Sequence, residues 1–400
     1  MIHSSYYRPN IFPINGDVDK ANIDRLQELT ATTTLNREKI KEIGRDGLVD
    51  WRKATPDISL SMRQLEYGSL EFYRKLTSKG DSVSTISFTD FKTPTFDIAG
   101  YKTDDAGTFT GTVYYPKCRC SGFTVNIGDP ESLIDRNFTV VGEDEIILRE
   151  ANKYLITKRY TLSGGTDETV TVSDPAPVAD PDNSGQYLFR VVKVVSGTAT
   201  TLVHGTGWSY DGAGTLTING VSTAGTVIKV WYSAGSYIGG EIPFTENDSD
   251  LAGIDAESCS VFLESSNYLY RLQSASFEVA LDRYDIGEIG NKDKVAYGTR
   301  DITARVTLGR ILEAYTIEEI LRGQAGNDYG KIDVREFASN LNLIIKVYSD
   351  NTKDTFKIGY KITDLAPSGT DTGTPTDDYI TRGVTLEGET GFITNVEGVL

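Results

Sequence analysis

The chain has 400 residues, of which 38% are hydrophobic and 24% charged, and its formal net charge is −17. This length allows two or three globular domains. The acidity excludes a protein that grips nucleic acid, because such proteins neutralise phosphates with clustered Lys and Arg. No apolar run approaches the roughly 18 residues of a membrane-spanning helix, and the N-terminus lacks the apolar core of a signal peptide. We therefore expect a protein made in the cytoplasm, without a membrane span.

The first predicted elements are a polar arm and two strands. Residues 1–24 show little pattern beyond Ile11, Phe12 and Ile14, which predicts an arm followed by a polar turn. Polar residues alternate with apolar or small ones from 26 to 35 and again from 57 to 63, and a period of two predicts half-buried strands. The connection between them, 36–55, is far longer than a hairpin loop of about two to five residues. It therefore predicts a projecting arm that contacts something else.

A helix and further strands follow. Ser69 is placed to start the helix, Leu70, Tyr73 and Leu76 are spaced for one buried face, and Gly80 lies beyond its end. Strands are predicted over 86–91, 108–115 and 137–148. Residues 155–246 differ, because short strands (187–195, 200–204, 214–218 and 226–232) alternate with Gly-rich turns. This pattern predicts a small Ig-like β-sandwich on the outside of the molecule.

The chain contains a long internal repeat. Arg25–Gly44 recurs as Arg271–Gly290, 246 positions later and without a gap. The same offset aligns Ile86 with Ile332, and Gly142-Glu143 with Gly388-Glu389. The chain therefore divides into repeat 1 (1–154), an insert (155–246) and repeat 2 (247–400). Repeat 2 carries its own predicted arm (282–301), a helix with a capping box at 316–319 and Gly323 beyond its end, and strands over 332–337, 341–348, 355–362 and 383–393.

Neither catalysis nor a cofactor is predicted. His3 and His204 are distant in the sequence, which leaves little for a Ser-His-Asp or Cys-His arrangement. Cys118, Cys120 and Cys259 are too few for a convincing zinc site or disulfide framework, and we expect reduced structural thiols. No GxxxxGK[ST] loop occurs. We therefore expect no enzyme, no cofactor and no metal.

Several segments together resemble the tail tube proteins of tailed bacteriophages, a fold shared with needle-tube proteins of contractile secretion systems. They are Leu272–Asn291 with Tyr297-Gly298, the segment Val141–Ile147, and Trp51–Phe72. The resemblance covers both repeats and not the insert. It implies two tandem mainly β domains, each a sandwich or partly closed barrel with one flanking helix. It also implies a structural virion protein whose six-domain rings stack into the conduit for genome ejection.

The resemblance assigns roles to two groups of residues. The small polar-acidic strand faces would line the lumen: Glu28, Thr30, Thr32, Asp57, Ser59, Ser61, Ser274, Ser276, Glu278, Thr303 and Thr307. Arg63 and Arg305 depart from this lining and are expected either to pair with carboxylates or to face elsewhere. The arms would contact the next ring through Arg37, Lys39, Arg45, Trp51, Arg283, Tyr284 and Lys292.

Two fused domains predict a pseudo-six-fold ring of three chains, with repeat 1 of one chain meeting repeat 2 of the next. A ring of six whole chains is the alternative. Expected partners are further copies of the chain, other tail proteins (tape measure, terminator, baseplate or sheath), and double-stranded DNA that passes the acidic lumen without specific binding. The protein would be assembled in the host cytoplasm and reside in the virion tail. Another tail or secretion-tube component, or an extracellular binding module, remains open as an alternative.

Overall fold

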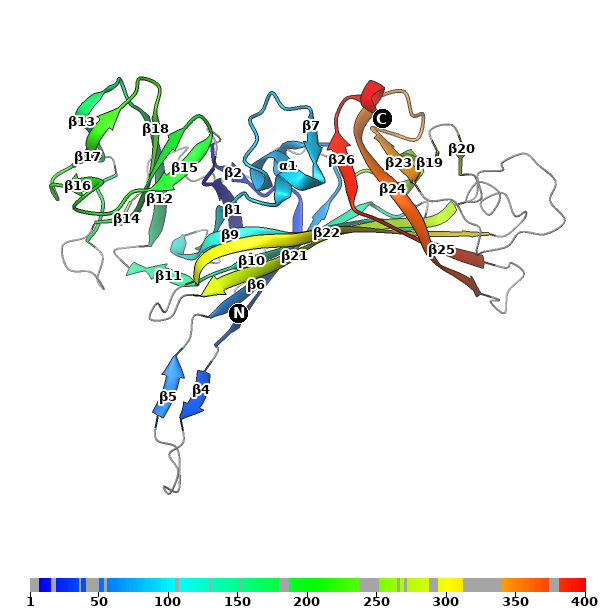
Figure 1. Ribbon diagram of the computed structural model, residues 1–400, viewed down its shortest axis with the longest axis horizontal. Coiled ribbons are helices and arrows are strands. Elements are labelled where there is room, and N and C mark those ends of the chain that lie inside the picture. Colours follow the sequence, from blue (N-terminus) through cyan, green and yellow to red (C-terminus); the bar gives the residue numbers. More distant parts are fainter. Residues whose placement is uncertain are drawn as a thin grey trace.

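The computed structural model is mainly β, which confirms the predicted fold class (Figure 1). It describes residues 7–15, 19–35, 37–40, 50–53, 56–104, 108–129, 131–150, 153–173, 175–179, 187–236, 252–264, 267–269, 272–287, 294–311, 340–373 and 381–400. The predicted helix at 316–323 and strand at 332–337 lie outside these residues. No helix in the described part of the chain is long and apolar enough to cross a membrane.

Repeat 1 builds two layers of antiparallel strands. Its strands are β1 (Tyr7–Pro13), β2 (Ala21–Asn22), β3 (Leu26–Thr34), β4 (Arg37–Ile40), β5 (Asp50–Lys53), β6 (Asp57–Leu65), β7 (Thr85–Ser87), β8 (Phe96–Thr103), β9 (Phe109–Ile127), β10 (Asp135–Gly142) and β11 (Ile146–Arg149). One layer has the order β3-β6-β10-β9. The other joins β2, β1, β8, the first half of β9, and β11. The long strand β9 therefore belongs to both layers.

Repeat 2 shows the same pattern of pairing. Its strands are β19 (Cys259–Leu263), β20 (Asn267–Tyr268), β21 (Leu272–Gly287), β22 (Lys294–Ile311), β23 (Leu341–Tyr348), β24 (Phe356–Gly373), β25 (Thr381–Gly388) and β26 (Thr390–Thr394). The order β21-β22-β25-β24 corresponds to β3-β6-β10-β9. Strands β20 and β25 begin and end 246 positions after β2 and β10.

The two repeats share one sheet, because β21 pairs with β9. The eight strands β3-β6-β10-β9-β21-β22-β25-β24 thus form a continuous antiparallel layer, which we call the polar sheet (Figure 1). A second junction pairs β26 with β7. Buried apolar side chains from both repeats pack between the polar sheet and the outer strands as a single core.

The helix α1 (Glu71–Leu76) is present in repeat 1, as predicted, and buries Phe72, Tyr73 and Leu76. Two expectations for repeat 1 were wrong. Residues 7–13 are not an arm but strand β1, which pairs with β8 because Ile11 and Phe12 find buried positions. The strand expected over 86–91 ends at Ser87, where a capping box with Asp90 starts a turn of 3-10 helix over Phe88–Phe91.

The insert forms two sheets. One has the order β12-β18-β14-β15 and the other β13-β17-β16. The bounds are β12 (Tyr154–Thr161), β13 (Gly165–Thr171), β14 (Leu188–Val195), β15 (Thr198–Thr201), β16 (Trp208–Tyr210), β17 (Thr215–Ser222) and β18 (Val227–Ala234). Its core is continuous with Phe12, Tyr101 and Tyr114 of repeat 1. The insert therefore packs on the outer layer, on the opposite side from the exposed face of the polar sheet (Figure 1).

Candidate functional site: a polar sheet face

One face of the polar sheet is buried and the other is exposed, as strand β6 shows most clearly. From Asp57 to Gln64, exposed and buried residues alternate without a break. Such alternation places Ile58, Leu60 and Met62 in the core and the intervening polar residues in solvent. We call the exposed side the polar face.

The predicted lumen residues all lie on this face. Thr30 is opposite Ser61, Thr32 opposite Ser59, and Ser276 opposite Thr307 in the strand register. The face is continuous between the repeats, because Glu278 is opposite Thr124 and Ser276 opposite Asn126 across the β9–β21 junction. The residues brought together are Glu28, Thr30, Thr32, Asp57, Ser59, Ser61, Ser274, Ser276, Glu278, Thr303 and Thr307, all exposed or half-exposed.

The two arginines of the polar face are paired with carboxylates. Arg63 forms an ion pair of 2.8 Å with Asp135, and the pKa of Arg63 is raised, mainly by that hydrogen bond. Arg305 forms one of 2.9 Å with Glu387 and lies opposite Glu278. Arg63 and Arg305 therefore each have an acidic partner on the same face. With Glu28, Asp57 and Glu278, the face carries more negative than positive charge.

The junction between the repeats is held by a buried polar cluster. The Glu66 carboxylate lies 3.3 Å from the Arg136 guanidinium, and both side chains are fully buried. Tyr360 of repeat 2 donates a hydrogen bond to Glu66, and Tyr73 lies 3.3 Å from Tyr360 between hydroxyl oxygens. Burial by itself would lower the pKa of Arg136, but the Glu66 carboxylate and nearby tyrosines hold it above its usual value. The guanidinium therefore remains charged.

The arm predicted in repeat 2 continues the β21–β22 ladder and lies against repeat 1. Arg283 donates to the backbone carbonyls of Phe91, Lys92 and Cys120, the first at 2.6 Å. The Arg119 guanidinium stacks 3.5 Å from the centre of the Tyr297 ring. The arm is thus bound within the chain. Tyr284 lies beneath the Arg300 guanidinium, at 5.4 Å.

The arm of repeat 1 has a different course. Strands β4 and β5 form a separate two-stranded hairpin that extends away from the polar sheet (Figure 1). Arg37 is opposite Lys53, and Lys39 is opposite Trp51 in this hairpin. Arg45 and Lys292, which were assigned to the same inter-ring contact, lie outside the described residues.

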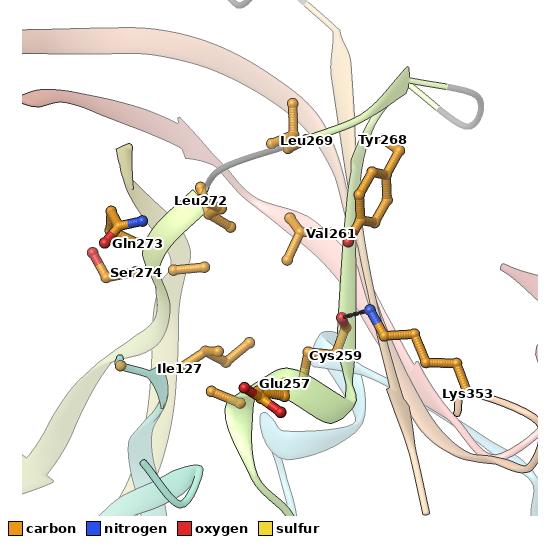
Figure 2. Close-up of a pocket in the computed structure, with 13 residues that line it drawn as sticks. Ile127, Glu257, Cys259, Val261, Tyr268, Leu269, Leu272, Gln273, Ser274 and Lys353 are labelled. Carbon is orange, nitrogen blue, oxygen red and sulfur yellow. Dashed lines mark hydrogen bonds between the residues drawn. The ribbon is translucent and has the colours of Figure 1, made fainter. Parts of the chain in front are cut away.

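A small cleft lies at the end of the β9–β21 junction (Figure 2). It has a volume of about 170 Å³, and its lining combines apolar residues such as Ile127, Val261 and Leu272 with polar ones such as Glu257, Gln273 and Ser274. The Lys353 ammonium donates to the Cys259 carbonyl at 2.7 Å. We assign this cleft no ligand.

The three cysteines are free and buried. Burial raises the pKa of Cys120 to about 11 and that of Cys259 to about 12, so these thiols stay protonated near neutral pH. Among the residues that the structure describes, no group of three or more His, Cys, Asp or Glu is placed to hold a metal ion.

Comparisons with known proteins give little further information. No protein-family model matches the sequence, and no curated protein matches it. The chain is similar to one in a cryo-EM structure of an extracellular contractile injection system, the PVC sheath–tube complex in its extended state, with 12% identity and a TM-score of 0.27. The similarity covers 36% of this chain and 92% of that chain. Similarity of this extent carries no functional argument, which rests instead on the geometry of the polar sheet.

Sequence reasoning missed the polar residues that β9 and β10 contribute to the face, such as Thr124, Asn126 and Thr139. In β9 the alternation is obscured, because its first half is buried in the outer layer and a bulge shifts the register near Gly122. The buried cluster was also missed. Its one available signal was Arg136, which alternates in step with the apolar residues Phe138 and Val140 of the same strand.

Proposed function

We propose that the protein is a structural subunit of a tail tube, in which repeats 1 and 2 are two copies of one tube domain and residues 155–246 an outward-facing insert. The observation that carries the proposal is the polar face. Eight strands from both repeats present hydroxyl, amide and carboxylate groups on one continuous side, while the core and the insert lie on the other. A wall of this kind suits the inner surface of a conduit.

The chemistry of the face suits passage rather than binding. Its arginines are already paired with Asp135 and Glu387, so they are poorly available to phosphates. A surface of small hydroxyls and net negative charge repels phosphate and prevents adhesion. We propose that the residues predicted for the lumen line it, and that double-stranded DNA passes without specific contacts during genome ejection.

We propose a ring of three chains, and the strand count is compatible with it. Three polar sheets of eight strands would close a barrel of about 24 strands, and barrels of about 16–18 strands already leave an aqueous channel. Closure would also remove the two open edges of the sheet. Such rings would stack into a tube and meet other tail proteins at its ends or outer surface, with the β4–β5 hairpin available for contact with a neighbour.

Negative-stain imaging of the purified protein tests this function. Hollow rings or tubes, with three chains counted per ring in end-on views, are expected. Rings of six whole chains would retain the conduit and exclude the trimer. A chain that stays monomeric at high concentration would overturn the tube function and favour an extracellular binding module built around the insert.

A further inference from the structure

We propose that β3 of one chain pairs with the second half of β24 of another copy, in the register that β21 and β9 use within the chain. This inference rests on the proposed tube function and names the joint between subunits. Among the described strands, β3 pairs with β6 alone, and residues 366–373 of β24 pair with β25 alone. Each polar sheet thus ends in two edges that are the counterparts of strands already paired inside the chain.

The strand equivalence fixes the register. The β3–β6 and β21–β22 ladders agree at the offset of 246, including a bulge after Leu26 and after Leu272. Strand β24 carries one extra residue before Ala366, since Gly122 is opposite Thr139 whereas Gly369 is opposite Thr385, and the same shift is already present at Ala366. The dipeptide Ser121-Gly122 therefore corresponds to Ser368-Gly369. Transferring the β9–β21 register places Thr34 opposite Gly369 and Thr33 opposite Thr370.

Gly369 supplies independent support. A Cβ on Gly122 would meet the Val279 carbonyl oxygen of β21 at 2.8 Å, so the junction between the repeats requires glycine there. A Cβ on Gly369 would meet no atom of the described residues within 4 Å, so this part of the chain itself imposes no such requirement. The glycine fits a strand that approaches from a second copy, with the Thr33 carbonyl in the position of the Val279 carbonyl.

The core-facing side of β3 gives a third argument. Leu35 is 59% exposed, whereas its counterpart Leu281 is 4% exposed at the junction. Thr33 is likewise exposed and its counterpart Val279 buried. A second copy on β3 would cover Leu35 as repeat 1 covers Leu281.

The two kinds of joint differ in chemistry. Within the chain, Val279 is opposite Phe123, and both are buried apolar residues. Between chains, the equivalent pair is Thr33 and Thr370. The joint between chains therefore buries less apolar surface, and we expect rings to open at β3–β24 while β9–β21 stays closed.

The first experiment uses Gly369→Val, imaged by negative stain and measured by thermal unfolding. We expect the variant to fold with an unchanged midpoint for the single chain and to form no rings. Gly80→Val is the matched control, because a Cβ there also meets no described atom within 4 Å, and it should assemble normally. Normal ring formation by Gly369→Val would overturn the proposed joint.

The second experiment tests the register with Thr33→Cys plus Thr370→Cys under oxidising conditions. Paired residues on antiparallel strands have Cα atoms about 4.5–5.5 Å apart, within disulfide range. A non-reducing gel should show bands of two and three chains. The control, Thr33→Cys plus Ser368→Cys, places the thiols about 7–8 Å apart and should cross-link at least ten-fold less.

The outcomes separate the joint from the function. Rings that form in the microscope but cross-link through the control pair would overturn the register and leave the tube function intact. Two results together would overturn both proposals: no rings from the unmodified chain, and no cross-links in either cysteine variant.

Discussion

Tyr360 and Glu66 are 294 residues apart in the chain, yet the Tyr360 hydroxyl donates a hydrogen bond to the Glu66 carboxylate inside the core. The same carboxylate accepts a 2.7 Å hydrogen bond from the Gly68 backbone and lies beside Arg136. A buried ion pair contributes little net stability, but removal of one partner leaves an uncompensated charge. We therefore expect this contact to couple the folding of the two repeats.

Substitution of this cluster should destabilise both repeats together. Tyr360→Phe should lower the free energy of unfolding by about 1–3 kcal/mol, because it removes a hydrogen bond to a buried charge. Arg136→Met should lower it by about 3–5 kcal/mol, since Glu66 would lose its counter-charge. Urea unfolding followed by far-UV circular dichroism, which reports the strands of both repeats, measures both. Tyr348→Phe, which loses only a long hydrogen bond of 3.4 Å to Glu397 near the surface, serves as the control and should change little.

The attachment of the insert depends on Arg190. Its guanidinium contacts the fully buried Asp97 of repeat 1, which also accepts a 2.7 Å hydrogen bond from Tyr114. Arg190→Met should cost about 3–5 kcal/mol, because the Asp97 carboxylate would remain buried without a cation. Arg305→Met removes an exposed pair and should cost at most about 1 kcal/mol. Equal effects of the two substitutions would contradict the buried linkage.

Alkaline pH should destabilise the chain. Burial raises the pKa of Cys120 to about 11 and of Cys259 to about 12, above the ordinary thiol pKa of 9.0. Above pH 9 the unfolded chain loses these protons while the folded chain keeps them, so the stability present below pH 9 falls as pH rises. Each thiol contributes a slope of about 1.4 kcal/mol per pH unit.

Urea unfolding at pH 9 and pH 10 measures this slope. Cys259→Ala removes one of these thiols, so the slope should fall by up to about 1.4 kcal/mol per pH unit. The cavity that it leaves also lowers the free energy of unfolding at every pH. An unchanged slope in this variant would show that the Cys259 thiol ionises equally in both states.

The arm of repeat 2 should detach when Arg283 is removed. Arg283→Ala leaves the carbonyls of Phe91 and Cys120 without their charged donor, which should cost about 1.5–3 kcal/mol. Hydrogen exchange of residues 294–299 should rise accordingly. Arg300→Ala is the control, because Arg300 is an exposed residue of β22, the strand whose exchange is measured. Protection that persists in Arg283→Ala would assign the anchoring to Arg119 and Tyr297 instead.

Strands with uninterrupted alternation could be predicted from the sequence. Residues 57–63 place every second side chain in the core, and β6 follows this pattern throughout. The same alternation identified the exposed residues of β21 and β22. In β3 the expected core face was wrong, because Leu29 is only half-buried and Ala31 and Thr33 are exposed where β6 is the one described strand that pairs with it. The alternation also failed where one strand serves two layers, as in β9, because the period changes with the surroundings along the strand. Contacts such as Tyr360 with Glu66 could not be predicted, since they depend on how two distant segments pack.

The internal repeat also left one relation unspecified. An offset of 246 aligns β3 with β21, but β24 is shifted by one residue relative to β9. An alignment at one fixed offset does not detect the extra residue of β24, because the shared dipeptide Ser-Gly is too short a match to reveal the shift. The pairing of β24 with β25 was required to find it.

The insert has a consequence for any assembly of this chain. It packs against Phe12, Tyr101 and Tyr114 of repeat 1, and this core includes no described residue of repeat 2. In a ring of such chains the insert would therefore cover repeat 1 and not repeat 2, so the outer surface would repeat once per chain even where the inner wall repeats once per domain. A protein that recognises the insert would find one docking position on residues 155–246 of each chain, and its copy number would count subunits rather than domains.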